Sequence, residues 1–316
     1  MRICILDDLE GVALESADWA SLESVVDAVD RHVADPDELV ALLQAYDVVV
    51  AQRERTAFPR SVLERLPDLR LLVTTGPRNA AIDVAACADL GITVCHTRPG
   101  GTPVVEHAWA LILAALRDIP GHVASMRAGE WAPVAGRSLE GRTLGLVGLG
   151  KTGTRMARIG TAFGMDVVAW SENLTDDVAA ERGARLVTKN ELFASSDVVS
   201  VHTLLSRRTR GLVADEELRA MRRDAWLVNT SRGPIVDEAA LLRACREGWI
   251  AGAAVDVFDV EPLPADHELR RLPNVLLTPH AGYVTRENFR DWFDDVVEDI
   301  AAFAAGTPVR TLTPPP

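Results

Sequence analysis

The chain carries the stretch Thr143-Leu144-Gly145-Leu146-Val147-Gly148-Leu149-Gly150-Lys151-Thr152-Gly153 near its middle. Its first half predicts a buried strand, and the glycines that follow have the Gly-x-Gly-x-x-Gly spacing of a tight turn from a strand into a helix. Such a turn directs unpaired backbone N–H groups and the positive end of a helix dipole toward a phosphate group. A glycine-rich turn also serves other tight junctions between a strand and a helix, so the surrounding sequence has to decide between the two interpretations.

The residues after this stretch complete a β-α-β unit. Residues 148–160 predict a helix with small residues on one face, and residues 165–170 predict the next buried strand. In this context the turn predicts a site for the pyrophosphate of a dinucleotide. The residues expected to line that site are Gly148, Gly150, Lys151, Thr152 and Gly153.

The end of the second strand departs from the usual dinucleotide pattern. A carboxylate normally holds the adenosine ribose hydroxyls there, and this chain has Ser171 followed by Glu172. Either Glu172 takes over the ribose contact, or Ser171 and Asn173 bind the ribose by neutral hydrogen bonds and leave room for a 2′-phosphate. Glu172 is equally typical of an exposed loop charge. Because residues 171–175 contain no Arg or Lys and Glu172 would repel a phosphate, we expect NAD, with NADP as the alternative.

Composition and charge exclude several classes of partner. The 316 residues, 48% of them hydrophobic, exceed what one compact core usually serves, so we expect two domains. A net charge of −13 argues against binding to nucleic acid or to an anionic membrane. The longest apolar segment, residues 108–116, is too short to span a bilayer. Any anionic substrate must therefore meet a local basic patch.

The cysteines indicate a reducing environment. They are scattered without Cys-x-x-Cys spacing, so neither a disulfide framework nor a zinc site is indicated, and we expect no metal. Residues 1–8 predict a strand rather than a secretory signal, so we expect a cytoplasmic protein. The four cysteines are Cys4, Cys87, Cys95 and Cys245.

Short apolar runs alternate with helical stretches along the chain, which is the pattern of parallel sheets with crossover helices. A Pro/Gly-rich joint at 98–103 separates two sets of runs, and a last helix at 287–303 returns to pack on the first set. The residues after 310 are expected to fray. The runs of the first set lie at 3–6, 47–51, 69–74 and 92–95, and those after the glycine turn lie at 165–170, 184–187, 198–202, 225–229, 251–256 and 275–278.

We therefore expect an α/β protein with two doubly wound parallel-sheet domains. A Rossmann cofactor domain, residues 101–285, is inserted into a flavodoxin-like substrate domain, residues 1–100 and 286–316. The two joints near 98–101 and 282–286 are expected to act as hinges that close the domains and exclude water.

Three polar side chains each lie just beyond the end of an apolar run: Arg232, Glu261 and His280. Because doubly wound folds bind ligands at the carboxyl ends of their strands, the three residues are expected at one binding edge. The planar fork of Arg232 fits a carboxylate, and a His beside a carboxylate suits proton transfer to a carbonyl oxygen. Taken singly, each residue also has an ordinary interpretation as a surface ion-pair partner, a turn residue or a structural His.

With these residues in view, the chain resembles the D-isomer-specific 2-hydroxyacid dehydrogenase family over nearly its whole length. The resemblance implies that Arg232 anchors the substrate carboxylate and carbonyl, that His280 is the acid/base and that Glu261 orients it. It also implies that Asp256 holds the carboxamide of the nicotinamide ring. Besides the glycine turn, the stretches that carry the resemblance are residues 75–83, 229–237, 254–262 and 278–285.

In the first domain the resemblance implies a backbone cradle for the substrate carboxylate. Pro77 lies within this segment and has no N–H to offer. Arg53 follows a predicted strand, where it either faces the substrate or forms a surface ion pair with Glu54 or another nearby acid. The residues expected to form the cradle are Thr75, Gly76 and Arg78.

Further cofactor contacts are expected after the second β-α-β unit. The loop at 202–210 is unusually basic and is expected to border the adenosine site. Arg207 or Arg208 could reach a 2′-phosphate, or these arginines simply solvate the loop. The additional residues expected to contact the cofactor are His202, Thr209 and Thr230.

The activity implied by the resemblance is the interconversion of a small 2-oxo acid and a D-2-hydroxy acid with NAD or NADP. In the reductive direction C2 receives a hydride, protonated His280 gives its proton to the oxygen, and Arg232 stabilises the charge that develops there. Two alternatives stay open. One is a formate or phosphite dehydrogenase on the same scaffold, although formate enzymes of the superfamily lack the partner that Glu261 provides. The other is a corepressor-like interaction protein that senses the dinucleotide.

The segment after the joint predicts self-association. Residues 104–116 predict a helix that is apolar almost all round, and the next residues continue this surface. We expect a homodimer through the cofactor domain, as the resemblance also implies; the alternative is a core helix between the two domains of one chain. The apolar residues that follow the helix are Ile119, Val123, Met126 and Trp131.

Overall fold

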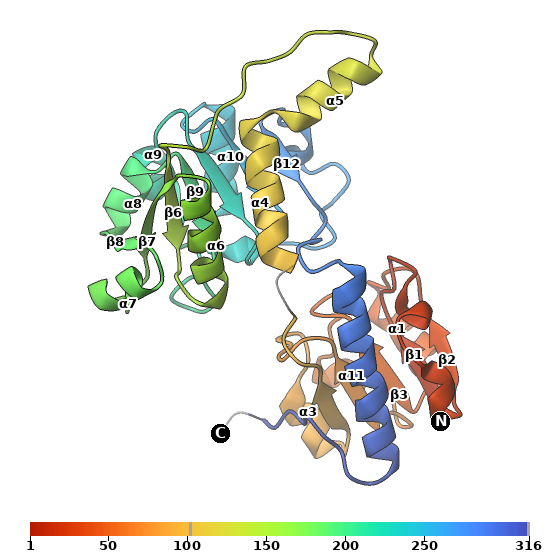
Figure 1. Cartoon of the computed structure of the whole chain (residues 1–316). Helices are drawn as coiled ribbons and strands as arrows, with labels where there is room; N and C mark the ends of the chain where they lie inside the picture. Colours follow the sequence, from red (N-terminus) through yellow and green to blue (C-terminus); the bar gives the residue numbers. More distant parts are fainter. Residues whose placement is uncertain (101–102, 315–316) are drawn as a thin grey trace. The chain divides into compact units, whose positions relative to one another are not determined.

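The computed structural model describes residues 1–100 and 103–314. The chain divides into two compact units, of which unit 1 is Met1–Gly101 with Val284–Pro316 and unit 2 is Thr102–Tyr283 (Figure 1). Unit 2 is therefore an insertion in the sequence of unit 1. Gly101 and Thr102, which belong to the expected joint at 98–103, lie outside the described residues.

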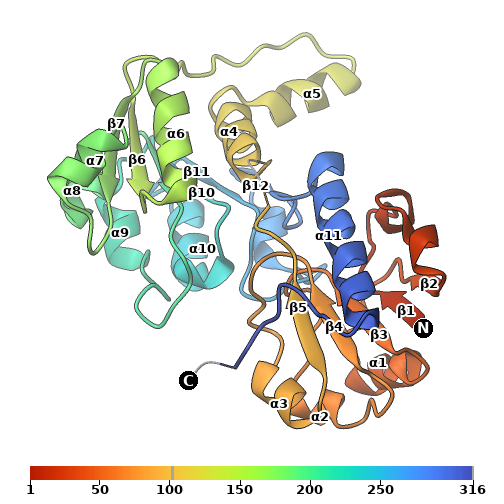
Figure 2. The same ribbon diagram turned by 60° about the horizontal axis from the view of Figure 1, so that its bottom comes forward.

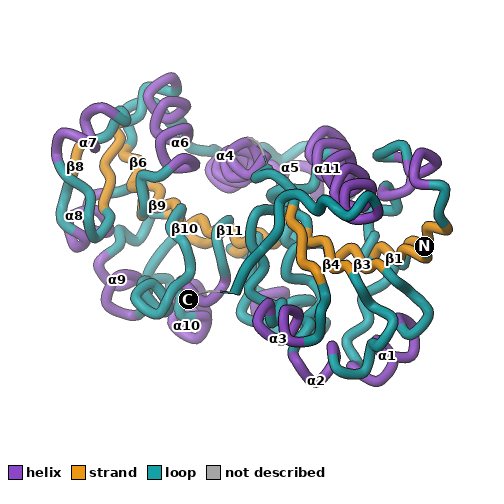
Figure 3. Tube along the Cα trace, turned by 90° about the horizontal axis from the view of Figure 1, so that it is seen from below, coloured by secondary structure: helices purple, strands orange, loops and turns teal. Residues whose placement is uncertain are grey.

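Unit 1 is built on a five-stranded parallel sheet with the order β2-β1-β3-β4-β5. Helices α1 (Pro36–Leu43), α2 (Arg60–Leu63) and α3 (Val84–Asp89) cover one face, and α11 (Arg286–Ala304) covers the other (Figure 3). This is a flavodoxin-like arrangement. The strands are β1 (Arg2–Ile5), β2 (Val25–Ala28), β3 (Val48–Ala51), β4 (Leu71–Thr74) and β5 (Thr93–His96).

Local sequence explains where the helices of unit 1 begin. The Asp35 carboxylate accepts hydrogen bonds from the N–H groups of Asp37 and Glu38, and Pro36 occupies the first turn of α1. Thr285 caps α11 in the same way through the N–H of Asn288. From there α11 buries Phe289 and Phe293 on the sheet face opposite α1, α2 and α3.

Unit 2 is built on a seven-stranded parallel sheet with the order β12-β11-β10-β9-β6-β7-β8. The order reverses between β6 and β9, which is where doubly wound sheets open a ligand crevice. The strands are β6 (Thr143–Val147), β7 (Asp166–Trp170), β8 (Arg185–Leu186), β9 (Val198–Val201), β10 (Trp226–Asn229), β11 (Gly252–Val255) and β12 (Val275–Leu277).

Helices cover both faces of this sheet. Buried residues of α4 (Pro103–Leu116), α6 (Lys151–Ala162) and α7 (Asp176–Glu181) share one apolar cluster with the sheet. Residues of α8 (Lys189–Ser195), α9 (Asp215–Ala220) and α10 (Glu238–Arg246) form the other. The expected fold class is thus confirmed. Short 3-10 turns are η1 (Ala13–Glu15), η2 (Trp19–Leu22), η3 (Gly233–Ile235) and η4 (Glu268–Arg271).

Of the apolar surface predicted for residues 104–131, the part after α4 is exposed and the part on α4 is not. Helix α4 buries half of its residues, among them Trp109 and Ile112, against β10, β11 and α6. It is therefore a core helix of unit 2, and the prediction that it exposes excess apolar surface is wrong. Helix α5 (Ile119–Arg127), all of which the structure describes, buries none of its residues, and it extends away from the sheet together with the segment that follows (Figures 1 and 2).

The carboxyl-terminal segment is ordered against unit 1. Thr311 forms an antiparallel bridge with Cys95, and the Leu312 N–H donates to the Val94 carbonyl, so these residues extend the sheet of unit 1 instead of fraying. Pro315 and Pro316 lie outside the described residues. Within the part of the chain that the structure describes, no helix combines the length and apolar character needed to cross a membrane.

Candidate active site

The glycine turn of unit 2 is tight at two of its glycines and open at the third. Gly148 has φ +100°, and a Cβ there would lie 2.7 Å from the His202 carbonyl oxygen. A Cβ at Gly153 would lie 2.2 Å from the Gly148 oxygen, so both positions require glycine. Gly150 precedes α6, and a Cβ there would meet no atom within 4 Å. The open side of the turn therefore faces the amino end of a twelve-residue helix, and this fits a pyrophosphate.

Two further residues expected to contact the cofactor are His202 after β9 and Thr230 after β10. The Nε2 atom of His202 lies 2.8 Å from the Ser200 hydroxyl oxygen, and burial lowers the pKa of His202 to about 4, so the imidazole is neutral at physiological pH. The Thr230 hydroxyl is buried and has no hydrogen-bond partner among the described residues. Because an unpaired buried hydroxyl costs free energy, this atom fits a bound ligand.

The adenosine end of the site shows one contact that the sequence did not suggest. Ser171 follows β7, and Glu172 beside it is exposed. The Arg182 guanidinium, at the end of α7, donates to the Leu149 carbonyl inside the glycine turn at 2.6 Å. No local signal in the sequence could have identified Arg182, because the contact joins residues 33 positions apart.

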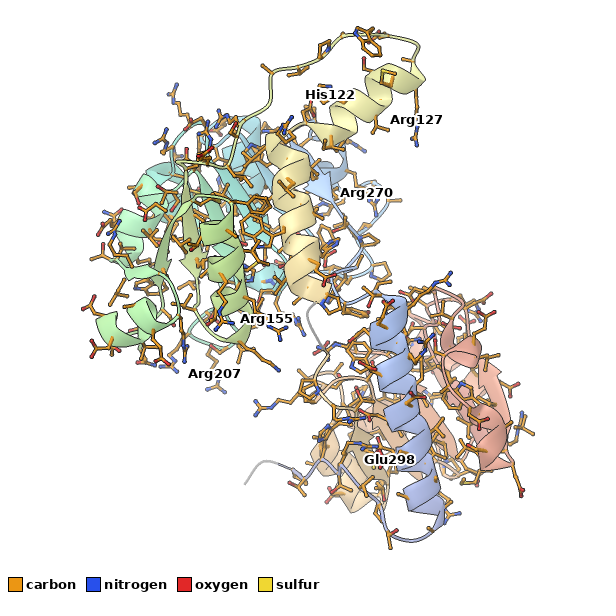
Figure 4. The ribbon with its side chains drawn as sticks, in the orientation of Figure 1. His122, Arg127, Arg155, Arg207, Arg270 and Glu298 are labelled. Carbon is orange, nitrogen blue, oxygen red and sulfur yellow. The ribbon has the colours of Figure 1, made fainter. Side chains whose placement is uncertain are left out.

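The loop at 202–210 is braced by its own side chains. The Thr209 hydroxyl donates to the Leu204 carbonyl at 2.6 Å and accepts from the Ser206 N–H at 2.7 Å. This internal bonding accounts for Thr209, and its expected cofactor contact stays a prediction. Arg155 of α6 and Arg207 of this loop both lie toward the carboxyl edge of the seven-stranded sheet (Figure 4).

His280 and Glu261 meet directly. The His280 Nδ1 atom lies 2.6 Å from a Glu261 carboxylate oxygen, and the other carboxylate oxygen accepts a hydrogen bond from the Phe258 N–H at 2.8 Å. His280 itself has φ +54°, in the left-handed region that non-glycine residues rarely adopt. The pair therefore has a fixed geometry, in which Nε2 is the ring nitrogen that does not contact Glu261.

The Asp256 carboxylate holds the turn that carries His280. It accepts hydrogen bonds from the Thr278 hydroxyl at 2.5 Å and from the N–H groups of Ala281 and Gly282 at 2.7 and 2.9 Å. The His107 Nε2 atom of α4 lies 3.2 Å away. Burial acts to raise the pKa of Asp256, but the hydrogen bonds from His107 and Thr278 outweigh it, so the pKa lies below its ordinary value.

Asp256 therefore has a structural task that the sequence did not reveal, and its expected contact with the nicotinamide carboxamide stays a prediction. His107 was also missed, because it lies about 150 residues before its partner Asp256, in a helix whose other residues apart from Glu106 are apolar.

Arg232 lies in the turn after β10, the strand beside β11. The Asn229 side-chain amide donates to the Arg232 carbonyl at 3.0 Å and fixes the turn after β10. A Cβ on Gly233 would lie 2.1 Å from the Phe258 carbonyl carbon, so the turns after β10 and β11 are in close contact. Since β10, β11 and β12 are neighbours in the sheet, Arg232, Glu261 and His280 come from three adjacent strand ends.

Unit 1 presents Arg53 after β3. Arg53 has φ +55°; its N–H donates to the Thr75 hydroxyl at 3.0 Å, and its carbonyl accepts from the Asn79 amide at 2.5 Å. The guanidinium lies against Gly76, because a Cβ there would be 1.8 Å from the Arg53 Nη1 atom. The centroid of the Trp292 ring lies 5.9 Å from the Cζ atom of the Arg53 guanidinium. These contacts fix the main chain at Arg53 and enclose its side chain.

The expected backbone cradle is partly occupied by internal hydrogen bonds. The Gly76 N–H donates to the Thr97 hydroxyl at 2.6 Å, and the Thr75 N–H donates to the Ala51 carbonyl. Arg78 is exposed. The structure therefore brings Arg53, Thr75 and Gly76 together, and the carboxylate cradle stays a prediction.

The two parallel sheets, the open glycine turn at the switch point and the histidine–carboxylate pair define an α/β dehydrogenase with a Rossmann cofactor domain. Residues 109–282 match the family model for the D-isomer specific 2-hydroxyacid dehydrogenase, NAD binding domain. The chain belongs to this family. It is accordingly an oxidoreductase that interconverts a 2-oxo acid and a 2-hydroxy acid with a nicotinamide dinucleotide, as the sequence predicted.

Known proteins resemble the chain beyond the cofactor domain. A glyoxylate reductase of Aeropyrum pernix is 40% identical over 256 residues, which cover 78% of this chain and 76% of the relative. A D-3-phosphoglycerate dehydrogenase of Bacillus subtilis is 35% identical over 90% of this chain, which spans only 54% of that relative. A solved structure from Ralstonia solanacearum, described as a putative D-3-phosphoglycerate dehydrogenase oxidoreductase, matches 99% of this chain and 97% of its own, with 34% identity and a TM-score of 0.94.

Proposed function

We propose that His280, Glu261 and Arg232 carry out the family reaction in this chain, with His280 as its acid/base. The observation that carries the proposal is the 2.6 Å contact between His280 Nδ1 and the Glu261 carboxylate. Because that contact occupies Nδ1, the other ring nitrogen, Nε2, is the atom that gives or takes the substrate proton. Glu261 stabilises the imidazolium form, which the reductive direction requires.

The bound cofactor supplies the hydride. During reduction His280 protonates the carbonyl oxygen, and the Arg232 guanidinium stabilises the negative charge that develops on this oxygen. During oxidation neutral His280 removes the hydroxyl proton. Asp256, through the turn it holds, keeps His280 in its left-handed conformation throughout.

Arg53 is proposed as the residue of unit 1 that binds the substrate carboxylate, with Thr75, Gly76 and Arg78 around it. The enclosed guanidinium and its fixed main chain support this role, because a group that is already ordered loses little entropy when it binds.

NAD is the proposed cofactor. Glu172 is exposed directly after β7, where its carboxylate can accept hydrogen bonds from ribose hydroxyls and would repel a 2′-phosphate. The Arg182 guanidinium, a basic group beside the glycine turn, is engaged by the Leu149 carbonyl.

The proposed substrate is a small 2-oxo acid such as glyoxylate or hydroxypyruvate, and the proposed product is the D-hydroxy acid. The name of the Aeropyrum pernix relative supports glyoxylate. The test is initial-rate measurement with a panel of 2-oxo acids and either NADH or NADPH, followed by chiral analysis of a product with a stereocentre. We expect turnover with NADH and mainly the D acid. Mainly L acid would contradict the proposed face of hydride attack, and faster turnover with NADPH would contradict the cofactor assignment.

A homodimer and a cytoplasmic location complete the proposal. The apolar side chains exposed on α5 and after it support self-association, and four free, buried cysteines suit a reducing compartment.

A further inference from the structure

Arg53 has an acidic neighbour at the place where a substrate anion would bind. The Arg53 Nη2 atom lies 3.4 Å from a Glu54 carboxylate oxygen, and the two side chains are only 15% and 28% exposed. Water therefore screens this pair less than a surface pair. Because Thr75 and Asn79 fix the main chain at Arg53, Glu54 is held in the same loop and its charge stays near the guanidinium.

The other arginines of the neighbouring loops are also matched by carboxylates. Arg55 pairs with Glu10 at 2.6 Å, and Arg98, after β5, pairs with Asp295 of α11 at 2.5 Å. Arg78 is the arginine of these loops to which the described residues give no ion pair. Two further buried acids, Asp7 and Asp8, follow β1 at the same edge of the sheet.

This balance of charge suits one substrate carboxylate and no second anionic group. A carboxylate brings one negative charge, whereas a phosphoryl group adds about 1.5 to 2 more at neutral pH. A phosphoryl group placed near Arg53 would be repelled by the Glu54 carboxylate. Of the described arginines in the neighbouring loops, Arg78 alone would have a positive charge left to balance it.

We propose that Glu54 is a specificity-determining residue that restricts the enzyme to 2-oxo acids carrying a single negative charge. The proposal rests on the proposed function, in which Arg53 binds the substrate carboxylate. The proposal distinguishes between two activities named for the relatives, glyoxylate reductase and D-3-phosphoglycerate dehydrogenase. The substrate 3-phosphoglycerate and its oxidised form, 3-phosphohydroxypyruvate, carry a phosphoryl group, whereas glyoxylate does not. This chain should therefore use the unphosphorylated acids.

The test compares hydroxypyruvate and 3-phosphohydroxypyruvate, which differ only in the phosphoryl group. Steady-state kcat/KM is measured for both acids with NADH, for the wild type and for Glu54→Gln and Glu54→Ser. We expect the wild type to prefer hydroxypyruvate by at least about 100-fold, and both variants to shift this ratio by at least about 10-fold toward the phosphorylated acid, as expected for removal of one nearby repulsive charge. The shift should shrink as ionic strength rises.

Glu64→Gln is the matched control. Glu64 also pairs with an arginine of unit 1, at 3.7 Å from Arg60, but both side chains are exposed and lie on α2 and at its end. Its removal should leave the ratio unchanged. A wild type that uses 3-phosphohydroxypyruvate as well as hydroxypyruvate, or Glu54 variants with an unchanged ratio, would overturn the inference while leaving the proposed function intact. Absence of turnover with both acids and with glyoxylate would instead overturn the proposed function, and this inference with it.

Discussion

His280 combines an unusual main-chain conformation with an ordinary side-chain hydrogen bond. The left-handed conformation at φ +54° is compensated by three bonds around it, from the His280 N–H to the Asp256 carbonyl and from the next two N–H groups to the Asp256 carboxylate. Such strain persists only where the surroundings determine it, and it is common at functional sites. At the scale of residues, the proposed mechanism therefore depends on Asp256 as well as on Glu261.

Glu261→Gln should lower kcat for reduction more than it changes KM. Without the carboxylate at 2.6 Å, the His280 ring loses the charged partner that orients it, so Nε2 is less often placed to give its proton to the substrate oxygen. The measurement is steady-state kcat and KM for the best substrate of the panel. Glu247→Gln, at an exposed position after α10, serves as the control, and an unchanged kcat in Glu261→Gln would refute the role of Glu261.

Arg232→Lys should lower both kcat and substrate affinity. Lysine keeps the positive charge but loses the planar fork, which we expect to cost about 3 kcal/mol of transition-state stabilisation if the fork is desolvated in the complex. The check is steady-state kinetics beside Arg243→Lys, which removes the fork of an exposed arginine of α10 that pairs with Asp215 of α9. Unchanged kinetics in Arg232→Lys would remove this residue from the site.

At the scale of elements, the buried strands were predictable because their apolar runs are continuous. Edge strand β2 was missed because its Val25–Ala28 sequence is short and interrupted by Asp27, and its side chains are exposed or only half-buried. The pairing of Thr311 with Cys95 was also missed, because a single bridge between residues far apart in the chain leaves no periodic pattern.

Helix α5 is the element on which the proposed dimer depends. Its Ile119, Val123 and Met126 side chains are exposed, and Trp131 in the following segment is 86% exposed. His122 and Arg127 lie on the same helix (Figure 4). Burial of these apolar side chains in a partner would contribute roughly 25 cal/mol per Å².

We expect a solution mass of about twice 34.2 kDa, measured by light scattering coupled to size exclusion at micromolar concentration. The double variant Val123→Asp, Met126→Asp should run as a single chain, because each new charge would be buried at the interface. Ser125→Asp, on the same helix, is the control for an added negative charge, and it should leave the mass of the dimer unchanged. A wild type with the mass of one chain would contradict the dimer and leave the catalytic proposal untouched.

At the scale of the whole molecule, the sequence identified the polar side chains but not the contacts that position them. Arg232, Glu261 and His280 stand at strand ends that could be located from apolar runs, and the structure shows Glu261 and His280 in contact. His107, Arg182 and Thr97 could not be found, because each acts on a residue more than twenty positions away. Their positions depend on how the sheets fold, which no local pattern encodes.

The insertion of unit 2 also sets the order in which the chain can fold as it is synthesised. Strands β1 to β5 of unit 1 have all been synthesised once β5 has emerged, but α11, which packs on one face of their sheet, begins about 190 residues later. At the usual speed of translation this interval lasts roughly 10 to 40 seconds. During that time the apolar face that later contacts Phe289 and Phe293 is open to water and to other nascent chains, so the newborn polypeptide should be most prone to aggregate, and most in need of a chaperone, just before its last helix leaves the ribosome.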